Sequence, residues 1–303
     1  MIIGHQKQQE FLKRVVETGR LPHAFLFSGV ESLGKKTVAF KFLESLNCKK
    51  FSKQSPDLLV VAPEREIAIS QIREVRSFLS LKPFSAPFKQ VVIDQAEKMK
   101  KDAQNCLLKT LEEPPDNSLI ILISATPDML FKTIRSRCQI LKFYPLSEDE
   151  LRLFLKDKAR CAAELEKIIF FAEGRPGRAL RFLEKPQMLD VYQAMLRRIG
   201  EIACSPLTFR FQYLKKFFNQ DSEQKKLKLF LQLLFKYFRT LFLLKLKKTS
   251  PPFLFDSIFL NSLQSFCLLK IKKILEELEQ AQFLIFQTNI NKKLVLENLF
   301  LKI

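Results

Sequence analysis

A glycine-rich loop, set between an apolar run and a helical pattern, is the part of this sequence best suited to chemistry. The apolar run Ala24–Ser28 leads directly into GVESLGKKT at positions 29–37. Gly29 and Gly34 permit the tight turns that expose backbone amides to a phosphate, and Lys35 can reach the terminal phosphates of a nucleotide. The combination of strand, loop and helix predicts a phosphate-binding loop and makes a chance pair of glycines the weaker explanation.

The metal-binding half of this loop departs from the usual pattern. The hydroxyl that coordinates Mg²⁺ normally belongs to a Ser or Thr directly after the lysine. Lys36 holds that place here, and Thr37 could serve only if the loop took in one extra residue. Asp94, at the end of a later apolar run, has the place of a metal-binding aspartate, but Gln95 follows it where a proton acceptor is needed. We therefore predict a degenerate site that requires no cofactor and binds ATP or ADP at most weakly.

Short apolar runs and helical patterns alternate through the first half of the chain, and this alternation positions the loop. The runs are rich in β-branched residues and too short for helices, so they predict strands. Strand–helix alternation indicates an α/β fold with a five-stranded parallel sheet covered by helices on both faces. The predicted strands are 24–28, 58–62, 90–94, 119–124 and 139–143, and the predicted helices are 6–16, 36–46, 69–79 and 102–113.

The strand patterns end at Pro145, and only helical patterns follow. Short helices are predicted over 148–156, 162–171 and 176–183, and a longer one over 188–199. Leu and Phe recur at helical spacing through the last third of the chain. We therefore predict three domains, which are an α/β domain over 1–145, a small helical domain over 146–200 and an all-helical domain over 201–303.

The formal charge of +19 over 303 residues predicts attraction to polyanions such as DNA, RNA or an acidic protein surface. A general richness in lysine is the alternative explanation. The only histidines are His5 and His23, and six scattered cysteines form no CxxC pair, so we expect neither a metal site nor a disulfide framework. No apolar run suits a membrane span, and the composition fits the reducing cytoplasm.

One predicted helix breaks a local rule at its end. Asp102 is expected to cap a helix whose apolar positions Ala103, Leu107 and Leu111 share one face. Glu112 and the glutamate after it end that helix, where the helix dipole disfavours anions. Either these glutamates contact a cation of a neighbouring molecule or water alone solvates them.

Lysines and arginines crowd the segment 207–248, where only Asp221 and Glu223 oppose them. They either form a basic surface near DNA or acidic partners, or they solvate helices whose other face lies in the core. We favour the second explanation. The expected core residues are Phe230, Leu234, Phe235, Phe238 and Leu241.

Several segments resemble the AAA+ module of bacterial clamp loaders. They are GRLPHAFLFSGV at 19–30, SPDLLVVAPE at 55–64, VVIDQAEKMKKDAQNCLLKTLEEPPDNSLIILIS at 91–124 and TIRSRCQILKF at 133–143. The segment from Gln287 to Leu299 is similar to the last collar helix of the delta-prime subunits of that family. The resemblance is dense through the first 180 residues and thinner beyond them.

The resemblance implies a subunit of a hetero-pentameric ring, in which gamma- or tau-type motors and a delta-type subunit are its partners. Such a ring loads the sliding clamp onto primer-template DNA in replication. The α/β domain would be the AAA+ P-loop domain, followed by a lid domain and a collar domain. No membrane partner is implied.

The resemblance also assigns individual residues. Arg137 matches an arginine supplied in trans to a neighbour's ATP site, where a guanidinium neutralises charge on the transferred phosphoryl group; its alternative role is a solvated surface ion pair. Arg178 matches the second sensor arginine, and either Ser124 or Thr126 matches the first sensor. Of the four-cysteine zinc module found in many relatives only Cys48 is present, so we expect no zinc.

Two further functions compete with a non-catalytic, delta-prime-like stator. A catalytically active gamma-type ATPase is the alternative within the family, and Lys36 and Gln95 argue against it. A stand-alone nucleic-acid-binding P-loop protein would explain the positive charge but not the SRC sequence at 136–138 or the collar-like tail.

Overall fold

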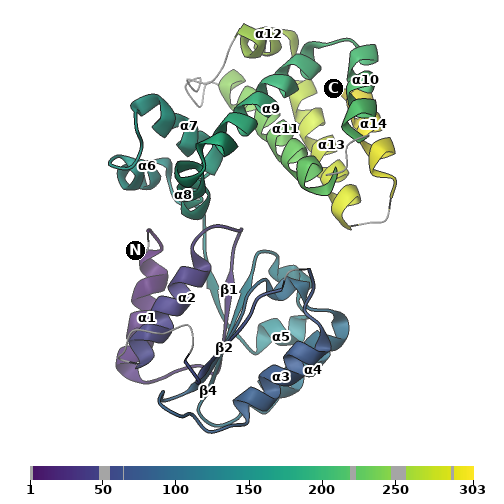
Figure 1. Cartoon of the computed structure of the whole chain (residues 1–303). Coiled ribbons are helices and arrows are strands. Elements are labelled where there is room, and N and C mark those ends of the chain that lie inside the picture. Colours follow the sequence, from purple (N-terminus) through teal and green to yellow (C-terminus); the bar gives the residue numbers. More distant parts are fainter. Residues whose placement is uncertain (1–2, 48–54, 64, 219–222, 247–256, 288–289) are drawn as a thin grey trace. The chain divides into compact units, whose positions relative to one another are not determined.

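The computed structural model describes residues 3–47, 55–63, 65–218, 223–246, 257–287 and 290–303, which fall into two compact units (Figure 1). The first unit comprises Met1–Lys158 and Ala172–Arg181, and the second comprises Ala159–Phe171 and Phe182–Ile303. The chain therefore passes between the units at 158/159, 171/172 and 181/182. The division into three domains with boundaries after 145 and 200 remains a prediction.

A five-stranded sheet forms the centre of the first unit, and all its strands are parallel (Figure 1). The strand order is β2-β3-β4-β1-β5, so β1 lies inside the sheet between β4 and β5. The predicted α/β fold class is confirmed, and each strand ends within one residue of its predicted bounds. The strands are β1 Ala24–Ser28, β2 Leu58–Val61, β3 Lys89–Ile93, β4 Ser118–Ser124 and β5 Gln139–Lys142.

Helices cover both faces of this sheet, because alternate strand residues point to opposite sides. Leu26 and Ile93 face one hydrophobic cluster together with helices α3 (Ile69–Leu79) and α4 (Lys101–Glu112). Phe25 and Phe27 face the other cluster with α1 (Gln6–Thr18) and α2 (Lys35–Asn47). The three inner strands β3, β4 and β1 are buried along their whole length, as the continuous apolar runs predict.

Helix α4 begins one residue earlier than predicted, and its cap was assigned wrongly. Lys100, in an extended conformation with φ −62° and ψ 157°, is the N-cap residue, and no side chain caps the helix. Asp102 lies inside the first turn, where its charge still suits the helix dipole. Ala103 and Leu107 are fully buried and Leu111 is nearly so, as predicted.

Three elements of a single turn were not predicted, since they are too short to show a hydrophobic period. They are the 3₁₀ helices η1 (Ala96–Lys98) and η2 (Pro127–Met129) and the short helix α5 (Lys132–Ser136). The predicted helices after the sheet are present as α6 (Glu148–Leu155) and α8 (Pro176–Glu184).

The described regular secondary structure of the second unit is all helical, and α11 supplies much of its core. Phe230, Leu234, Phe238 and Leu241 of α11 are buried, which confirms the core explanation for them, while Phe235 is half-buried. Helix α9 extends past its predicted end at residue 199. The helices are α7 Ala162–Ala172, α9 Pro186–Cys204, α10 Leu207–Phe218, α11 Glu223–Lys245, α12 Ser257–Ser265, α13 Leu268–Gln287 and α14 Lys292–Lys302.

Arg210 connects three of these helices through backbone carbonyl groups. Its Nε donates to the carbonyl oxygens of Ile202 at 3.1 Å and Ser205 at 2.9 Å, at the end of α9. Its two terminal nitrogens donate to Ala203, at 3.0 Å, and to Phe300 of α14, at 3.2 Å. A single guanidinium on α10 therefore binds carbonyl groups at the carboxyl ends of α9 and α14.

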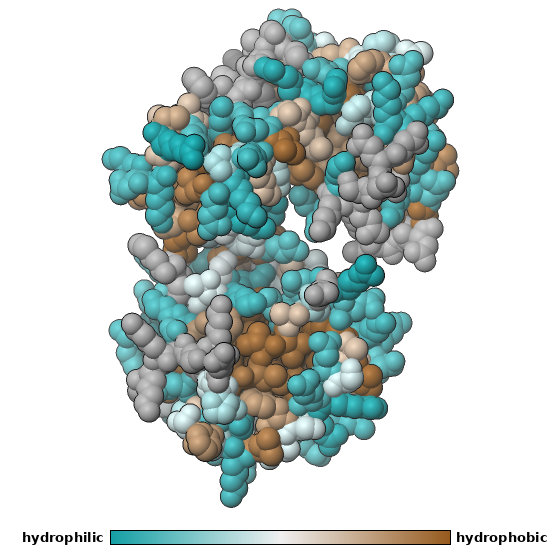
Figure 2. Space-filling view, viewed as in Figure 1, coloured by the Kyte–Doolittle hydropathy of each residue, from teal (hydrophilic) through white to brown (hydrophobic). Residues whose placement is uncertain are grey.

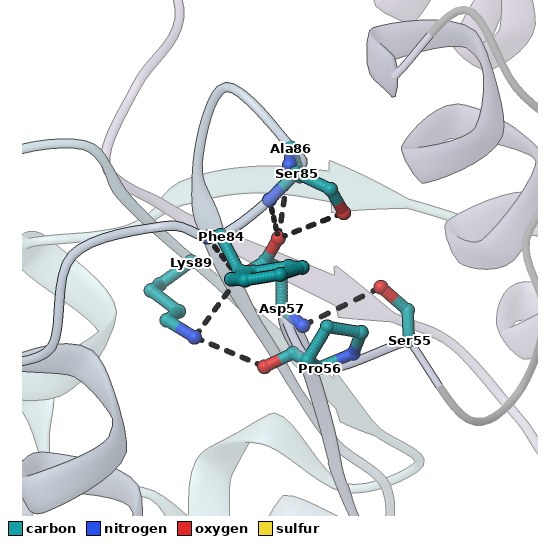
Figure 3. A network of polar contacts seen from close by, with 7 residues as sticks. All are labelled: Ser55, Pro56, Asp57, Phe84, Ser85, Ala86 and Lys89. Atoms are coloured by element: carbon teal, nitrogen blue, oxygen red, sulfur yellow. Dashed lines mark hydrogen bonds and ion pairs between the residues drawn. The ribbon is translucent and has the colours of Figure 1, made fainter.

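A buried ion pair fixes the loop between α3 and β3 (Figure 3). Asp57 is fully buried; its carboxylate lies 2.9 Å from Nζ of Lys89 and accepts backbone N–H bonds from Phe84, Ser85 and Ala86 at 2.6 to 2.9 Å. Burial alone would raise the pKa of Asp57, yet these hydrogen bonds outweigh it and hold the pKa well below its ordinary value. The exposed Phe84 side chain thus belongs to a firmly held loop.

Hydrophilic residues cover much of the visible face of each unit, with hydrophobic residues showing between them on the α/β unit (Figure 2). Within the described ranges, none of the helices has both the length and the apolar character that a bilayer span requires.

Candidate functional site

The predicted phosphate-binding loop connects the carboxyl end of β1 to the start of α2. Gly29 has φ +146°, and a Cβ added there would lie 2.3 Å from the carbonyl oxygen of Phe143. Gly34 has φ +89°, which favours glycine, and its carbonyl accepts a hydrogen bond from the Val38 N–H at 2.9 Å that begins α2. Thr37 lies exposed in the first turn of that helix.

Lys35 is folded back onto its own loop. Its ammonium donates to the carbonyl oxygens of Gly29 and, at 3.0 Å, of Val30, and only 6% of the residue is exposed. Burial lowers the pKa of Lys35, and the carboxylates of Glu97 and Asp94 offset this only in part. The cation that the sequence predicts for the terminal phosphates is therefore already partnered by the loop.

Lys36 and Asp94 form an ion pair beside the loop. The Lys36 Nζ lies 3.0 Å from Oδ2 of Asp94, which is the first residue after β3. The two side chains remain 45% and 18% exposed. A Mg²⁺ bound by Asp94 would compete with this ammonium for the same carboxylate and be repelled by its charge. The residues present therefore do not fit a bound Mg²⁺.

Gln95 is held in the left-handed conformation, with φ 53° and ψ 49°, and its N–H donates to Oδ1 of Asp94 at 3.1 Å. Two residues further on, Glu97 is a site residue that the sequence analysis missed. Its Oε1 accepts a hydrogen bond from the Ala125 N–H at 3.2 Å, and its charge offsets part of the burial effect that lowers the pKa of Lys35. The sequence Asp-Gln-Ala-Glu could have indicated Glu97, because it places a second carboxylate three residues after Asp94.

The start of α8 contacts the loop at Ser32. The Gly177 N–H donates to the Ser32 carbonyl at 2.9 Å, and the guanidinium of Arg181 donates to its hydroxyl. Arg178, the predicted second sensor, instead pairs with Glu173, with Nη1 3.1 Å from Oε2. Arg181 thus contacts the loop through a hydrogen bond that the sequence did not indicate. The sensor role of Arg178 remains a prediction.

The two candidates for the first sensor differ in their surroundings. Ser124, the last residue of β4, is fully buried, and its carbonyl accepts a hydrogen bond from the Gly29 N–H at 3.2 Å. The Ser124 hydroxyl has no hydrogen-bond partner within the described part of the chain. Thr126 is exposed and precedes η2. Ser124 therefore touches the loop through its backbone, and the choice between the two residues as sensor stays open.

Arg137 follows α5 and is held from two sides. Its Nη2 lies 2.9 Å from Oε1 of Glu112, and its Nη1 donates to the Thr133 carbonyl at 3.3 Å. The Arg137 side chain is 36% exposed and that of Glu112 is 48% exposed. The carboxylate at the end of α4, which the helix dipole disfavours, is thus met by a cation of the same chain. Neither sequence explanation for Glu112 included this intrachain partner.

Buried Gln104 connects α4 to the segment that carries α5. Its Nε2 donates to the carbonyl oxygens of Met99 and Met129, each at 3.2 Å, and its Oε1 accepts from the Phe131 N–H at 2.8 Å. With 4% of the residue exposed, Gln104 fixes the start of α5 relative to α4. No sequence pattern singled it out, because its role depends on contacts with a loop distant along the chain.

Among the described residues, no group of three or more His, Cys, Asp or Glu side chains is arranged to hold a metal ion. The zinc expectation concerns the segment around Cys48, which lies outside the described residues. The absence of zinc therefore remains a prediction.

The parallel sheet, the loop after β1 and the aspartate after β3 together have the arrangement of a P-loop module. The comparisons with known proteins narrow this class. Residues 4–147 match the family described as DNA polymerase III, delta subunit. The chain is 27% identical over 249 residues to DNA polymerase III subunit gamma of Buchnera aphidicola subsp. Acyrthosiphon pisum, covering 75% of this chain and 69% of the relative.

Two further comparisons concern a curated relative and a solved structure. The replication factor C small subunit of Methanococcus vannielii is 32% identical over 191 residues, which are 60% of this chain and 59% of the relative. A DNA polymerase III gamma subunit-related protein of Thermotoga maritima superposes with a TM-score of 0.48 and 22% identity over 97% of each chain. The chain is therefore similar to clamp-loader proteins, and its amino-terminal region matches a delta-subunit family.

Proposed function

We propose that this chain is a stator subunit of a DNA polymerase III clamp loader, of the delta-prime kind, without ATPase activity of its own. The observation that carries the proposal is the ion pair between Lys36 and Asp94, since it neutralises the aspartate that would hold Mg²⁺. Lys35 supports it, because its ammonium is engaged by loop carbonyl groups. Gln95 supplies no proton acceptor for an attacking water.

Arg137 supplies the chemistry of the proposed role. A guanidinium is always charged and presents several donors to a phosphate, so it can stabilise the charge that develops during phosphoryl transfer in a neighbour's site. Comparable arginines contribute roughly 10³ to 10⁵ in rate. A side chain that is held in place yet 36% exposed suits action across an interface.

The partners follow from the same proposal. The chain would assemble in the cytoplasm with gamma- or tau-type motors and a delta-type subunit, in a pentameric ring that loads the sliding clamp on primer-template DNA. The positive charge of +19 favours approach to DNA. Nucleotide, if taken up at the degenerate loop, would bind weakly and without Mg²⁺.

One observation favours the alternative of a gamma-type ATPase. The curated relative with 27% identity is a DNA polymerase III subunit gamma, and the match covers 75% of this chain. Against it stands the same local chemistry, because a motor needs Mg²⁺ where Lys36 pairs with Asp94.

ATP turnover of the reconstituted loader, stimulated by clamp and primed DNA, tests the proposal. Arg137→Ala is expected to lower turnover at the neighbouring site by about 10³-fold or more, whereas Lys35→Ala is expected to leave turnover unchanged. Arg198→Ala is the matched control, since Arg198 also forms a part-exposed ion pair, with Glu201 at 2.8 Å. Turnover by the isolated chain, or a loss with Lys35→Ala but not Arg137→Ala, would favour the motor instead.

A further inference from the structure

The contact between Glu112 and Arg137 suggests a second residue in the proposed reaction. We propose that Glu112 is a positioning residue, which holds the Arg137 guanidinium in the orientation that meets a neighbour's phosphate. The inference rests on the proposed role of Arg137 in trans. It assigns to Glu112 no contact with the nucleotide itself.

Two contacts restrain the Arg137 guanidinium, and some of its N–H donors remain available. A guanidinium carries five N–H donors in a planar fork. Glu112 engages Nη2 at 2.9 Å and the Thr133 carbonyl engages Nη1 at 3.3 Å. With 36% of the side chain exposed, donors remain for a phosphate oxygen. A long side chain held at two points loses less freedom when it binds, which is the advantage of a positioned group.

The surrounding elements direct this pairing. Arg135, two residues before Arg137, has its own carboxylate, Asp128, at 2.5 Å. Glu112 is thereby left to Arg137, while the buried Gln104 fixes α4 to the start of α5. A glutamate at the last position of a helix is unfavourable by itself. Its presence there is accounted for by the cation that it holds.

The test is ATP turnover of the complete reconstituted loader containing Glu112→Gln. The amide keeps the shape of the side chain and removes its charge. We expect kcat to fall about 3- to 10-fold with KM for ATP unchanged, a smaller loss than removal of the guanidinium itself. Glu66→Gln is the matched control, because Glu66 forms an exposed ion pair, 2.7 Å long, with Lys100 at the opposite end of α4; this variant should turn over like the wild type.

A double-mutant cycle separates positioning from a merely structural role. If Glu112 acts through Arg137, then Glu112→Gln adds no further loss in the Arg137→Ala background. An equal further loss in that background would overturn the inference, as would wild-type turnover of Glu112→Gln. In both cases, a loss of turnover with Arg137→Ala alone would still support the proposed stator function. Unchanged turnover with Arg137→Ala would contradict the proposed function itself.

In the free chain, the guanidinium NMR signals of Arg137 provide a readout independent of turnover. In the wild type the ion pair slows rotation of the terminal nitrogens. Glu112→Gln removes this restraint and should therefore shift and broaden the signals. Glu66→Gln should leave them in place. Signals unaffected by Glu112→Gln would mean that the ion pair does not hold Arg137 in solution, and would overturn the inference.

Discussion

The ammonium of Lys36 lies 3.0 Å from the carboxylate of Asp94, although the two residues are 58 positions apart along the chain. The carboxyl ends of β1 and β3 lie at one edge of the sheet, and this edge brings the two side chains together. The ammonium occupies a place where a divalent cation would otherwise find its ligand. The ion pair thus gives the predicted degenerate site a physical basis, which is a cation that belongs to the chain itself.

Lys36→Thr should restore Mg²⁺-dependent nucleotide binding. The substitution supplies the missing hydroxyl and frees Asp94 from its ion pair, so Mg²⁺ should raise the affinity for ATP by about tenfold or more. Calorimetric titration of the isolated chain with ATP, with and without Mg²⁺, measures the change. Lys41→Thr, on an exposed position of the same helix, is the control and should behave like the wild type. Mg²⁺-dependent binding by the wild type would contradict the prediction.

Asp57→Asn should lower the free energy of unfolding by about 3 kcal/mol or more. The substitution leaves the buried Lys89 ammonium, which is 5% exposed, without its counter-charge. Urea unfolding followed by circular dichroism gives the difference. Asp116→Asn, on an exposed position, should change stability by less than about 0.5 kcal/mol. Equal effects of the two substitutions would mean that the ion pair contributes little.

Lowering the pH should reduce the free energy of unfolding of the wild type more than that of Asp57→Asn. The pKa of Asp57 is lowered in the folded state, so its carboxylate stabilises the fold fully above the ordinary value of about 3.9 and loses this contribution as the pH falls below it. The difference in unfolding free energy between wild type and Asp57→Asn should therefore shrink from pH 7 to pH 3. A difference that stays constant over this range would exclude Asp57 as an acid-sensitive group.

Gly29→Ala and Gly34→Ala should destabilise the chain by different amounts. A Cβ at Gly29 would lie 2.3 Å from the Phe143 carbonyl oxygen, whereas a Cβ at Gly34 meets no atom within 4 Å among the described residues. Gly34→Ala therefore carries only the cost of a positive φ, about 1 to 2 kcal/mol, and Gly29→Ala adds displacement of the backbone after β5. Thermal unfolding of both variants compares them, and a smaller effect at Gly29 would contradict this account.

The strands of the sheet could be predicted from the sequence because each strand shows in a short-range pattern. Runs such as LIILIS in β4 are apolar throughout, which is the mark of a parallel strand buried on both faces. The cap of α4 could not be predicted as reliably. Asp102 is a residue type that commonly caps helices, but the N-cap is Lys100. The extended backbone of Lys100 cannot be read from its residue type.

In the candidate site too, local features could be predicted from the sequence and long-range contacts could not. Gly29, Gly34 and Lys35 were recognised from their spacing, since a phosphate-binding loop is a local structure. The partners of its charged groups were not, because those contacts join distant segments. The pairs Lys36 with Asp94, Glu112 with Arg137, and Ser32 with Arg181 exist only once the strands and helices are assembled.

The contact of Arg181 with Ser32 has a consequence for synthesis of the chain. The two residues are 149 positions apart, so at about 5 to 20 residues per second the ribosome adds Arg181 roughly 7 to 30 s after Ser32. During this interval the nascent loop lacks both the guanidinium and the Gly177 amide that hold Ser32. A transcript broken before codon 177 would therefore yield a sheet whose phosphate-binding loop never receives these contacts.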